Sequence, residues 1–223
     1  MCIRDSRLHL TESKRSGDGP LWELYSSFAI GGKRHAWPLQ RQVALAMKRF
    51  PFKRFTQWNL VTSNDQRVVL NQQLNRHFYA ESRQEGLWLP KSAKKAANEP
   101  QGYWLHKGLI LIGYMPQGVK AGFHNGQLME VQGLPDEQGY VELRDIERPA
   151  VNGRVTLKFL ADFWRLAYAF TGYSAQGRSL GNEATETEPE RGLTVHTSHK
   201  KFCKRALFTG ISRCRSVAVL QVC

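Results

Sequence analysis

Two segments near the C-terminal end of the sequence carry residues that suit the binding of phosphate groups. In AYAFTGYSAQGRSL (167–180), an apolar run ends at Thr171 and gives way to small and polar residues. Glycine lets the backbone approach a ligand closely, and hydroxyl and amide groups donate hydrogen bonds to phosphate oxygens. In ALFTGISRCRS (206–216), Arg213 follows a helix-like run, and a guanidinium is a planar fork of donors that suits a charged phosphoryl group. The simpler alternatives are a Gly-rich turn without a ligand and a basic surface residue.

A third candidate lies in WNLVTSNDQRVVLNQQLNRHF (58–78). We expect a short buried strand, WNLVT, followed by a cap and a helix. Thr62, Ser63 and Asn64 fall between strand and helix, where they either contact a nucleic-acid backbone or only cap the helix. The apolar face expected for the helix consists of Val69, Leu70, Leu74 and Phe78.

The pattern of the whole chain predicts an α/β fold that could bring these residues together. Helices are expected from about Pro20, at 39–49, at 155–165 and in KKFCKRALFTGIS (200–212). Strands are expected in the apolar run before Thr171, in LTVHT (193–197), in VAVLQV (217–222) and in several short runs between 103 and 146.

Other residues are expected to support the fold rather than the chemistry. Asn125-Gly126 is typical of a hairpin turn. Trp88, Tyr103 and Trp104 could stack on bases, but we expect all three in the core.

The sequence lacks the residues of a complete nucleotide-binding loop. GGKR (31–34) resembles the end of the G-x-x-x-x-G-K-[ST] pattern, but Ser27 stands at the first glycine and Arg34 at the final Ser/Thr. Asp136-Glu137 lies in a predicted turn rather than after an apolar strand. A site for ATP would therefore lie mostly outside this chain.

Five stretches, in order along the chain, resemble the C-terminal half of superfamily 1 helicases. The similarity is to the RecD-like branch, in the versions found in large DNA viruses and mobile elements. The stretches are LTESKRSGDGPLWELY, NLVTSNDQRVVLNQQLN, GLILIGYMPQGVKAGFHNGQLMEVQGL, AYAFTGYSAQGRSL and ALFTGISRCRS. The last two resemble the fifth and sixth motifs of that family.

The resemblance implies a second RecA-like domain of a P-loop NTPase motor with a small SH3-like β insertion. The implied parts are the tail of a preceding ATPase domain with a linker (1–36), RecA-like segments at 37–102 and 151–223, and the insertion at 103–150. The opening MCIRDS follows no structural pattern, as an artefactual sequence would.

The resemblance also implies roles for single residues. Arg213 would be an arginine finger and Arg15 a second sensor of the γ-phosphate. Gln176 and Gly177 would link the nucleotide to the DNA surface. Contacts to single-stranded DNA would come from Thr62, Ser63, Asn64, Thr171, Tyr173 and Ser174. The chain has Tyr-Ser-Ala (173–175) where the family more often has His-Lys-Ser, so one basic contact is missing.

ATP and Mg²⁺ would be bound mainly by a missing N-terminal RecA-like domain, so this fragment alone is expected to be inactive. Single-stranded DNA and duplex junctions would be its partners, and movement would run from 5′ to 3′. Two alternatives stay open: a non-catalytic basic nucleic-acid-binding protein with a decayed helicase fold, and an RNA helicase relative.

Composition agrees with a nucleic-acid partner. The net charge is +13 and the pI is about 9.9, and basic side chains displace counterions from phosphates. No signal peptide and no apolar run of membrane-spanning length is present, so we expect a soluble intracellular protein. The four cysteines show no disulfide spacing. We expect no metal site, although His196, His199 and Cys203 have a spacing that a zinc site could use.

Overall fold

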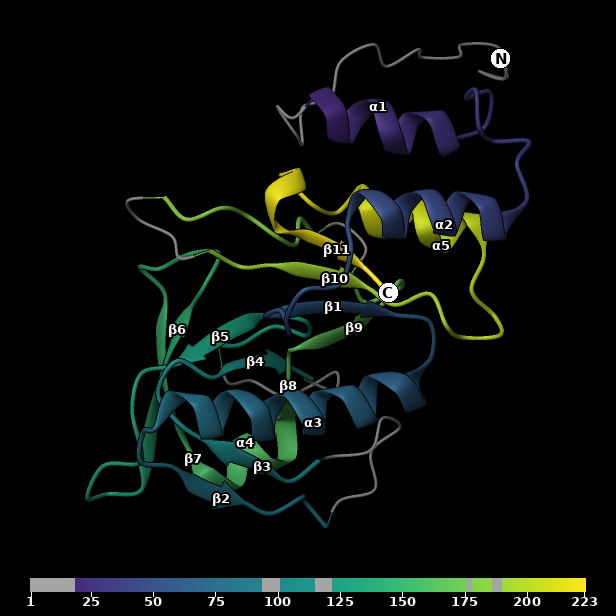
Figure 1. The fold of residues 1–223 in the computed structure, drawn as a ribbon. Coiled ribbons are helices and arrows are strands. Elements are labelled where there is room, and N and C mark those ends of the chain that lie inside the picture. Colours follow the sequence, from purple (N-terminus) through teal and green to yellow (C-terminus); the bar gives the residue numbers. More distant parts are fainter. Residues whose placement is uncertain (1–18, 94–100, 115–121, 176–177, 186–189) are drawn as a thin grey trace, which may run out of the picture.

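The computed structural model describes residues 19–93, 101–114, 122–175, 178–185 and 190–223, and their fold contains two main sheets (Figure 1). One is a four-stranded parallel sheet and the other a five-stranded antiparallel sheet. The predicted α/β class is confirmed.

The parallel sheet has the order β11-β10-β1-β9. Its strands are β1 (Trp58–Val61), β9 (Ala169–Thr171), β10 (Leu193–Val195) and β11 (Leu220–Val222). Helices cover both faces, which explains why these strands are almost continuously apolar and buried. On one side lie α1 (Gly19–Phe28), α2 (Leu39–Arg49) and α5 (Lys204–Ile211), and on the other lies α3 (Asn64–Ser82) (Figure 1).

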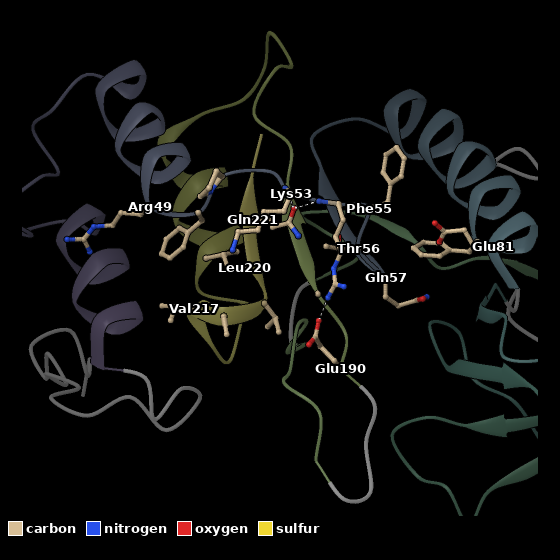
Figure 2. Close-up of a pocket in the computed structure, with 17 residues that line it drawn as sticks. Arg49, Lys53, Phe55, Thr56, Gln57, Glu81, Glu190, Val217, Leu220 and Gln221 are labelled. Carbon is tan, nitrogen blue, oxygen red and sulfur yellow. Dashed lines mark hydrogen bonds and ion pairs between the residues drawn. The ribbon is translucent and has the colours of Figure 1, made fainter.

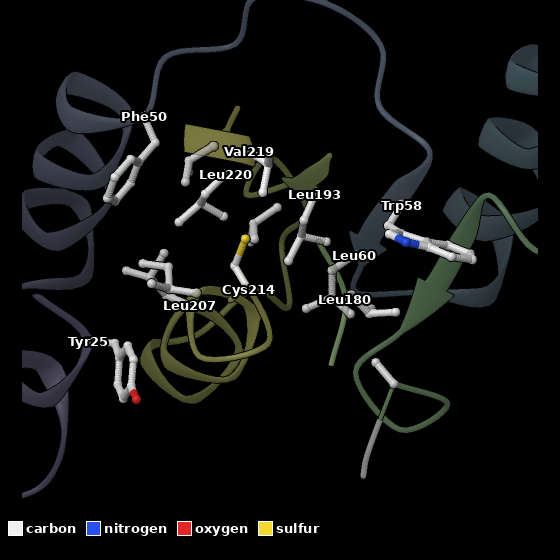
Figure 3. Packing of buried hydrophobic residues seen from close by; sticks show 14 of the residues in the cluster. Tyr25, Phe50, Trp58, Leu60, Leu180, Leu193, Leu207, Cys214, Val219 and Leu220 are labelled. Atoms are coloured by element: carbon white, nitrogen blue, oxygen red, sulfur yellow. The ribbon is translucent and has the colours of Figure 1, made fainter. Parts of the chain in front are cut away.

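The core on the α2 and α5 side of the parallel sheet is closely packed (Figure 3). Leu193 and Leu220 of the sheet lie in one buried cluster with Leu207 of α5. A Cβ added at Gly210 would lie 2.8 Å from Cγ1 of Val195. Glycine at this position therefore allows α5 to pack directly against β10.

The antiparallel sheet has the order β7-β6-β5-β4-β8. Its strands are β4 (Ile110–Gly113), β5 (Leu128–Val131), β6 (Tyr140–Asp145), β7 (Asn152–Thr156) and β8 (Trp164–Leu166), with α4 (Leu157–Phe163) between the last two. β6 alternates exposed and buried residues, as expected for a sheet with one face over a core. β2 (Leu87–Leu89) and β3 (Tyr103–Leu105) form a separate two-stranded sheet.

The two main sheets are joined by an almost continuous extended segment. Only Ala167 and Tyr168 separate β8 of the antiparallel sheet from β9 of the parallel sheet. Both residues are buried, and the N–H of Ala167 donates to the carbonyl of Ile110 at 3.2 Å. The strand that leads to Thr171 is therefore fixed at both ends by sheet hydrogen bonds.

The apolar face predicted for α3 is part of its buried face, since Leu74 is buried and Leu70 and Phe78 pack against the same core cluster. Val69 is 54% exposed, whereas Asn71 and Asn75 are buried beside Leu74. Each asparagine bonds the backbone of a strand: the N–H of Ala169 donates to Oδ1 of Asn71 at 2.9 Å, and the N–H of Trp104 donates to Oδ1 of Asn75 at 2.8 Å. The two asparagine side chains thus satisfy backbone N–H groups that have no further strand to pair with. This explains why α3 buries two polar side chains.

Several other expectations need correction. The helix expected at 155–165 is limited to α4, because the residues on both sides pair with the antiparallel sheet. That sheet runs to residue 166, past the end at 150 expected for the insertion. The expected strand at 217–222 begins as a 3₁₀ turn, Val217–Val219.

The expectations for the aromatic residues were met only in part, whereas the expected turn at Asn125-Gly126 is present. Tyr103 is buried as expected, but Trp88 is 45% exposed and packs edge-on against Trp104. Asn125 and Gly126 do form a turn, closed by a 3.2 Å hydrogen bond from the N–H of Gln127 to the carbonyl of His124.

Candidate functional site

The carboxyl ends of three parallel strands meet at one edge of the sheet. Val61, the last residue of β1, lies in register with Thr171, the last residue of β9, and β10 ends beside them at Val195. Ligands of open parallel sheets bind at this edge. A cavity of about 570 Å³ lies here, lined by predicted site residues from three distant segments: Thr62, Asn64, Thr171, Tyr173 and Arg213.

This cavity is positively charged. Lys201, Arg205 and Arg213 line it, and no Asp or Glu of the described ranges does. His196 also lines it but is uncharged at neutral pH, because burial lowers its pKa to about 4. The arrangement favours an anionic ligand such as a phosphate group.

The three residues after β1 have different local roles. Ser63 is the N-cap of α3, and its hydroxyl accepts the N–H of Gln66 at 3.2 Å. Gln66 returns the contact, since its Oε1 accepts the N–H of Thr62 at 3.3 Å. The capping alternative thus applies to Ser63. Thr62 and Asn64 line the cavity instead.

The loop after β9 is closed by its own hydroxyl groups. The N–H of Thr171 donates to Oγ of Ser174 at 3.0 Å, and the two hydroxyls lie 3.1 Å apart. Ser174 therefore shapes the turn, and it does not line the cavity that holds Arg213. Tyr173 is 89% exposed and can meet a ligand from solvent.

Arg213 is tied to the loop that follows Thr171. Its Nη1 donates to the carbonyl of Arg178 at 3.3 Å, and its own carbonyl accepts the N–H of Leu180 at 2.7 Å. The two segments that the sequence singled out for phosphate chemistry are thus bonded to each other. Arg15, Gln176 and Gly177 lie outside the described residues.

A neighbouring cavity of about 560 Å³ lies between the two main sheets. Asn64, Thr171 and Tyr173 line both cavities. Arg67, Arg165, Arg178 and Tyr114 add the basic and aromatic lining. Sequence reasoning missed these four, because only the docking of the antiparallel sheet beside α3 brings them together. The one available signal was the charge of the three arginines.

The possible zinc ligands lie in other contacts. Nε2 of His196 lies 3.0 Å from Oδ1 of Asn59, whose amide nitrogen donates to two backbone carbonyls. Nε2 therefore carries the proton, and Nδ1, 3.3 Å from Sγ of Cys223, is the acceptor. Within the described ranges, no three His, Cys, Asp or Glu side chains gather as metal ligands.

A larger cavity, about 650 Å³, lies at the opposite edge of the parallel sheet (Figure 2). Lys53, Arg54 and Phe55 line it with Glu81 and Glu190. None of the predicted site residues reaches this cavity, and Arg54 pairs with Glu190 at 2.5 Å. The edge with the predicted residues is therefore the better candidate, despite the smaller volume. No helix within the described ranges is both long and apolar enough to cross a bilayer.

No protein-family model matches the sequence, and no curated protein does. Solved structures do match the fold. A Bacteroides Pif1 helicase in complex with ADP-AlF3 and ssDNA has a TM-score of 0.60 at 16% identity, with 96% of this chain and 51% of that chain covered. A Pif1 helicase from Candida albicans has a TM-score of 0.58 at 14% identity, with 94% and 54% covered.

A structure of two coordinating Pif1 helicases at forked dsDNA gives a TM-score of 0.57 at 16% identity, covering 95% of this chain and 48% of that one. The chain therefore spans about half the length of these solved structures. At such low identity the likeness concerns the fold alone: the fold of this chain is similar to that of about half of a Pif1 helicase.

Proposed function

We propose that this chain is the second RecA-like half of an ATP-dependent DNA helicase. The observation that carries the proposal is the bonding of Arg213 to the loop after Thr171, at the carboxyl edge of the parallel sheet. The fifth and sixth motifs of such a motor would need to move together, because one contacts DNA and the other ATP. In this proposal the antiparallel sheet corresponds to the SH3-like insertion.

The proposed role of Arg213 is to stabilise the charge that develops on the γ-phosphate during hydrolysis. Arg15, Gln176 and Gly177 would complete the sensing of the nucleotide. ATP and Mg²⁺ would be held mainly by another RecA-like domain, and the roughly half-length coverage of the similar structures is consistent with such a domain.

The proposed DNA contacts are Thr62, Ser63, Asn64, Thr171, Tyr173 and Ser174. Four of them line the positively charged cavity, while Ser63 and Ser174 would act by shaping the two loops. Closure of the two domains around ATP would change this grip on a single strand, and hydrolysis would release it. The proposed direction is 5′ to 3′.

The DNA part can be tested with the 223-residue chain and fluorescein-labelled (dT)12. We expect binding that weakens steeply with salt and a loss of about tenfold in Thr62→Val, which removes one donor to a charged phosphate. Ser82→Ala removes a hydroxyl at the far end of α3 and is the control. If wild type, Thr62→Val and Ser82→Ala bind (dT)12 with equal affinity, the proposal that DNA binds at this edge of the sheet is wrong. The same titration with (rU)12 tests the RNA alternative.

For ATP we expect the opposite result: the chain alone should show no ATP hydrolysis. Since the nucleotide-binding loop is missing from this sequence, the purified chain should not hydrolyse ATP, with or without DNA. ATP turnover that depends on Arg213 in this chain would contradict the two-domain proposal. The coding sequence upstream of this chain distinguishes the non-catalytic alternative from the motor. The motor requires a G-x-x-x-x-G-K-[ST] loop and a strand ending in Asp-Glu in that upstream sequence, and the absence of both would favour the non-catalytic alternative.

A further inference from the structure

Two arginines are buried beside each other in the cavity between the main sheets. Arg67, from the first turns of α3, is 8% exposed, and Arg165, from β8, is 7% exposed. Both line the cavity of about 560 Å³. Burial lowers the pKa of both groups, and for Arg165 the nearby charge of Arg67 is the second cause, so that its pKa falls to about 10. Burial thus disfavours the charge of both guanidinium groups, and the charge of Arg67 further disfavours that of Arg165.

Nothing in the described part of the chain neutralises this pair. No Asp or Glu of the described ranges lines the cavity. Nε of Arg67 donates to Oδ1 of Asn64 at a long 3.4 Å, and Arg165 lies over the ring of Tyr114 at 3.8 Å. An amide and an aromatic ring orient a guanidinium but carry no opposite charge. Buried charges in proteins are ordinarily paired.

The third arginine of the cavity differs from these two. Nη1 of Arg178 lies 3.0 Å from Oε1 of Glu147, and Nη2 donates to the carbonyl of Gly126. Arg178 is therefore already satisfied within the chain. The unbalanced charge of the cavity belongs to Arg67 and Arg165 alone among the described residues that line it.

We propose that Arg67 and Arg165 form a phosphate-binding site that takes one backbone phosphate of a nucleic-acid strand. A strand that contacts Asn64, Thr171 and Tyr173 would reach this site directly, because these three residues line both cavities. The binding of a phosphate anion follows from the pair itself. Its assignment to a nucleic-acid strand rests on the proposed function.

The site can be tested by thermal unfolding in a chloride buffer, with and without sodium tripolyphosphate. Tripolyphosphate should raise the Tm of the wild type. Arg165→Gln and Arg67→Gln should unfold no earlier than wild type without the anion, because each removes a buried like charge, and both should lose most of the rise. Arg41→Gln is the matched control, since Arg41 also lies over an aromatic ring, that of Trp37 at 3.9 Å, but is exposed.

A second measurement is the affinity for fluorescein-labelled (dT)12. Arg165→Gln should weaken binding by about tenfold or more, as expected for a lost hydrogen bond between charged groups, and should reduce the salt slope by about one. The proposal is wrong if Arg165→Gln keeps both the tripolyphosphate effect and the affinity. It is also wrong if the variant unfolds earlier by the same amount with and without the anion.

The two proposals fail in different ways. If Arg165→Gln loses the tripolyphosphate effect but the wild type does not bind (dT)12, the anion site stands and the proposed function falls. If Thr62→Val weakens (dT)12 binding while Arg165→Gln does not, the proposed function stands and this site falls.

Discussion

Replacing Asn71 by leucine tests whether α3 is held to the parallel sheet by an amide rather than by apolar packing. Oδ1 of Asn71 accepts the N–H of Ala169 at 2.9 Å, and Nδ2 lies at a long 3.5 Å from the carbonyl of the same residue. Asn71 is fully buried and Ala169 is 2% exposed. Water therefore cannot replace the lost acceptor.

The expected loss follows from these distances. Leaving a buried N–H without an acceptor costs about 1–3 kcal/mol, and the 3.5 Å contact adds little. Leucine has the same number and branching of side-chain heavy atoms as asparagine, so Asn71→Leu should lower the free energy of unfolding by about 2 kcal/mol. In a chain of this size that corresponds to a fall in Tm of about 4–8 °C.

Urea unfolding followed by tryptophan fluorescence measures this loss. The m-value should not change, since the same surface is exposed on unfolding. Val69→Ala, on the exposed side of α3, should stay within about 0.5 kcal/mol of wild type. Asn75→Leu should lose more than Asn71→Leu, because both contacts of Asn75 to Trp104 are short, at 2.8 and 3.0 Å. Wild-type stability in Asn71→Leu would refute the reasoning.

Three further predictions concern the site and its support. His196 has a folded pKa of about 4, below the ordinary 6.5, so the unfolded chain binds more protons between these values and stability falls as pH falls from 6.5 to 4. His196→Asn should remove up to about 3 kcal/mol of this loss. In urea unfolding, the difference in free energy of unfolding between variant and wild type should therefore change between pH 6.5 and pH 4. A difference that stays constant over this pH range would contradict the prediction. Gly210→Val should lower the free energy of unfolding by about 1–3 kcal/mol, because the added atoms meet Val195; an unchanged urea midpoint would show that α5 can move away. Tyr173→Ala should leave Tm unchanged but weaken (dT)12 binding by about 1–3 kcal/mol if the ring stacks on a base, and anisotropy titrations with both proteins decide this.

Local signals in the sequence are sufficient where one short segment decides the structure. The strand, cap and helix around Ser63 follow from a buried apolar run and a capping residue, and the structure has all three. The same reasoning was right about Leu70, Leu74 and Phe78, which pack in or against one core cluster, but it was wrong about Val69, which is exposed, and it missed two buried asparagines. Apolar periodicity cannot show that Asn71 and Asn75 are buried, because their partners are backbone groups of strands far away in the sequence.

In the candidate site, too, some residues could be predicted from local sequence patterns and others could not. Motif order in the sequence suggested Thr171 and Arg213, and the register of the parallel strands then brings Thr62 to the same edge. No local pattern pointed to Arg67 or Arg165. Their burial depends on where the antiparallel sheet docks, and residue 165 was itself expected in a helix rather than in β8.

The order of strands in the parallel sheet has a consequence for the rate of folding. β1 pairs with β9 and β10, so each pairing must close a long loop before its hydrogen bonds form. β4 to β7 pair with their neighbours in the chain, and such local contacts form faster. We therefore expect the antiparallel sheet to form first. The edge that carries Thr62, Thr171 and Arg213 would be completed last, so a refolding chain would gain most of its strand structure before it could bind a ligand there.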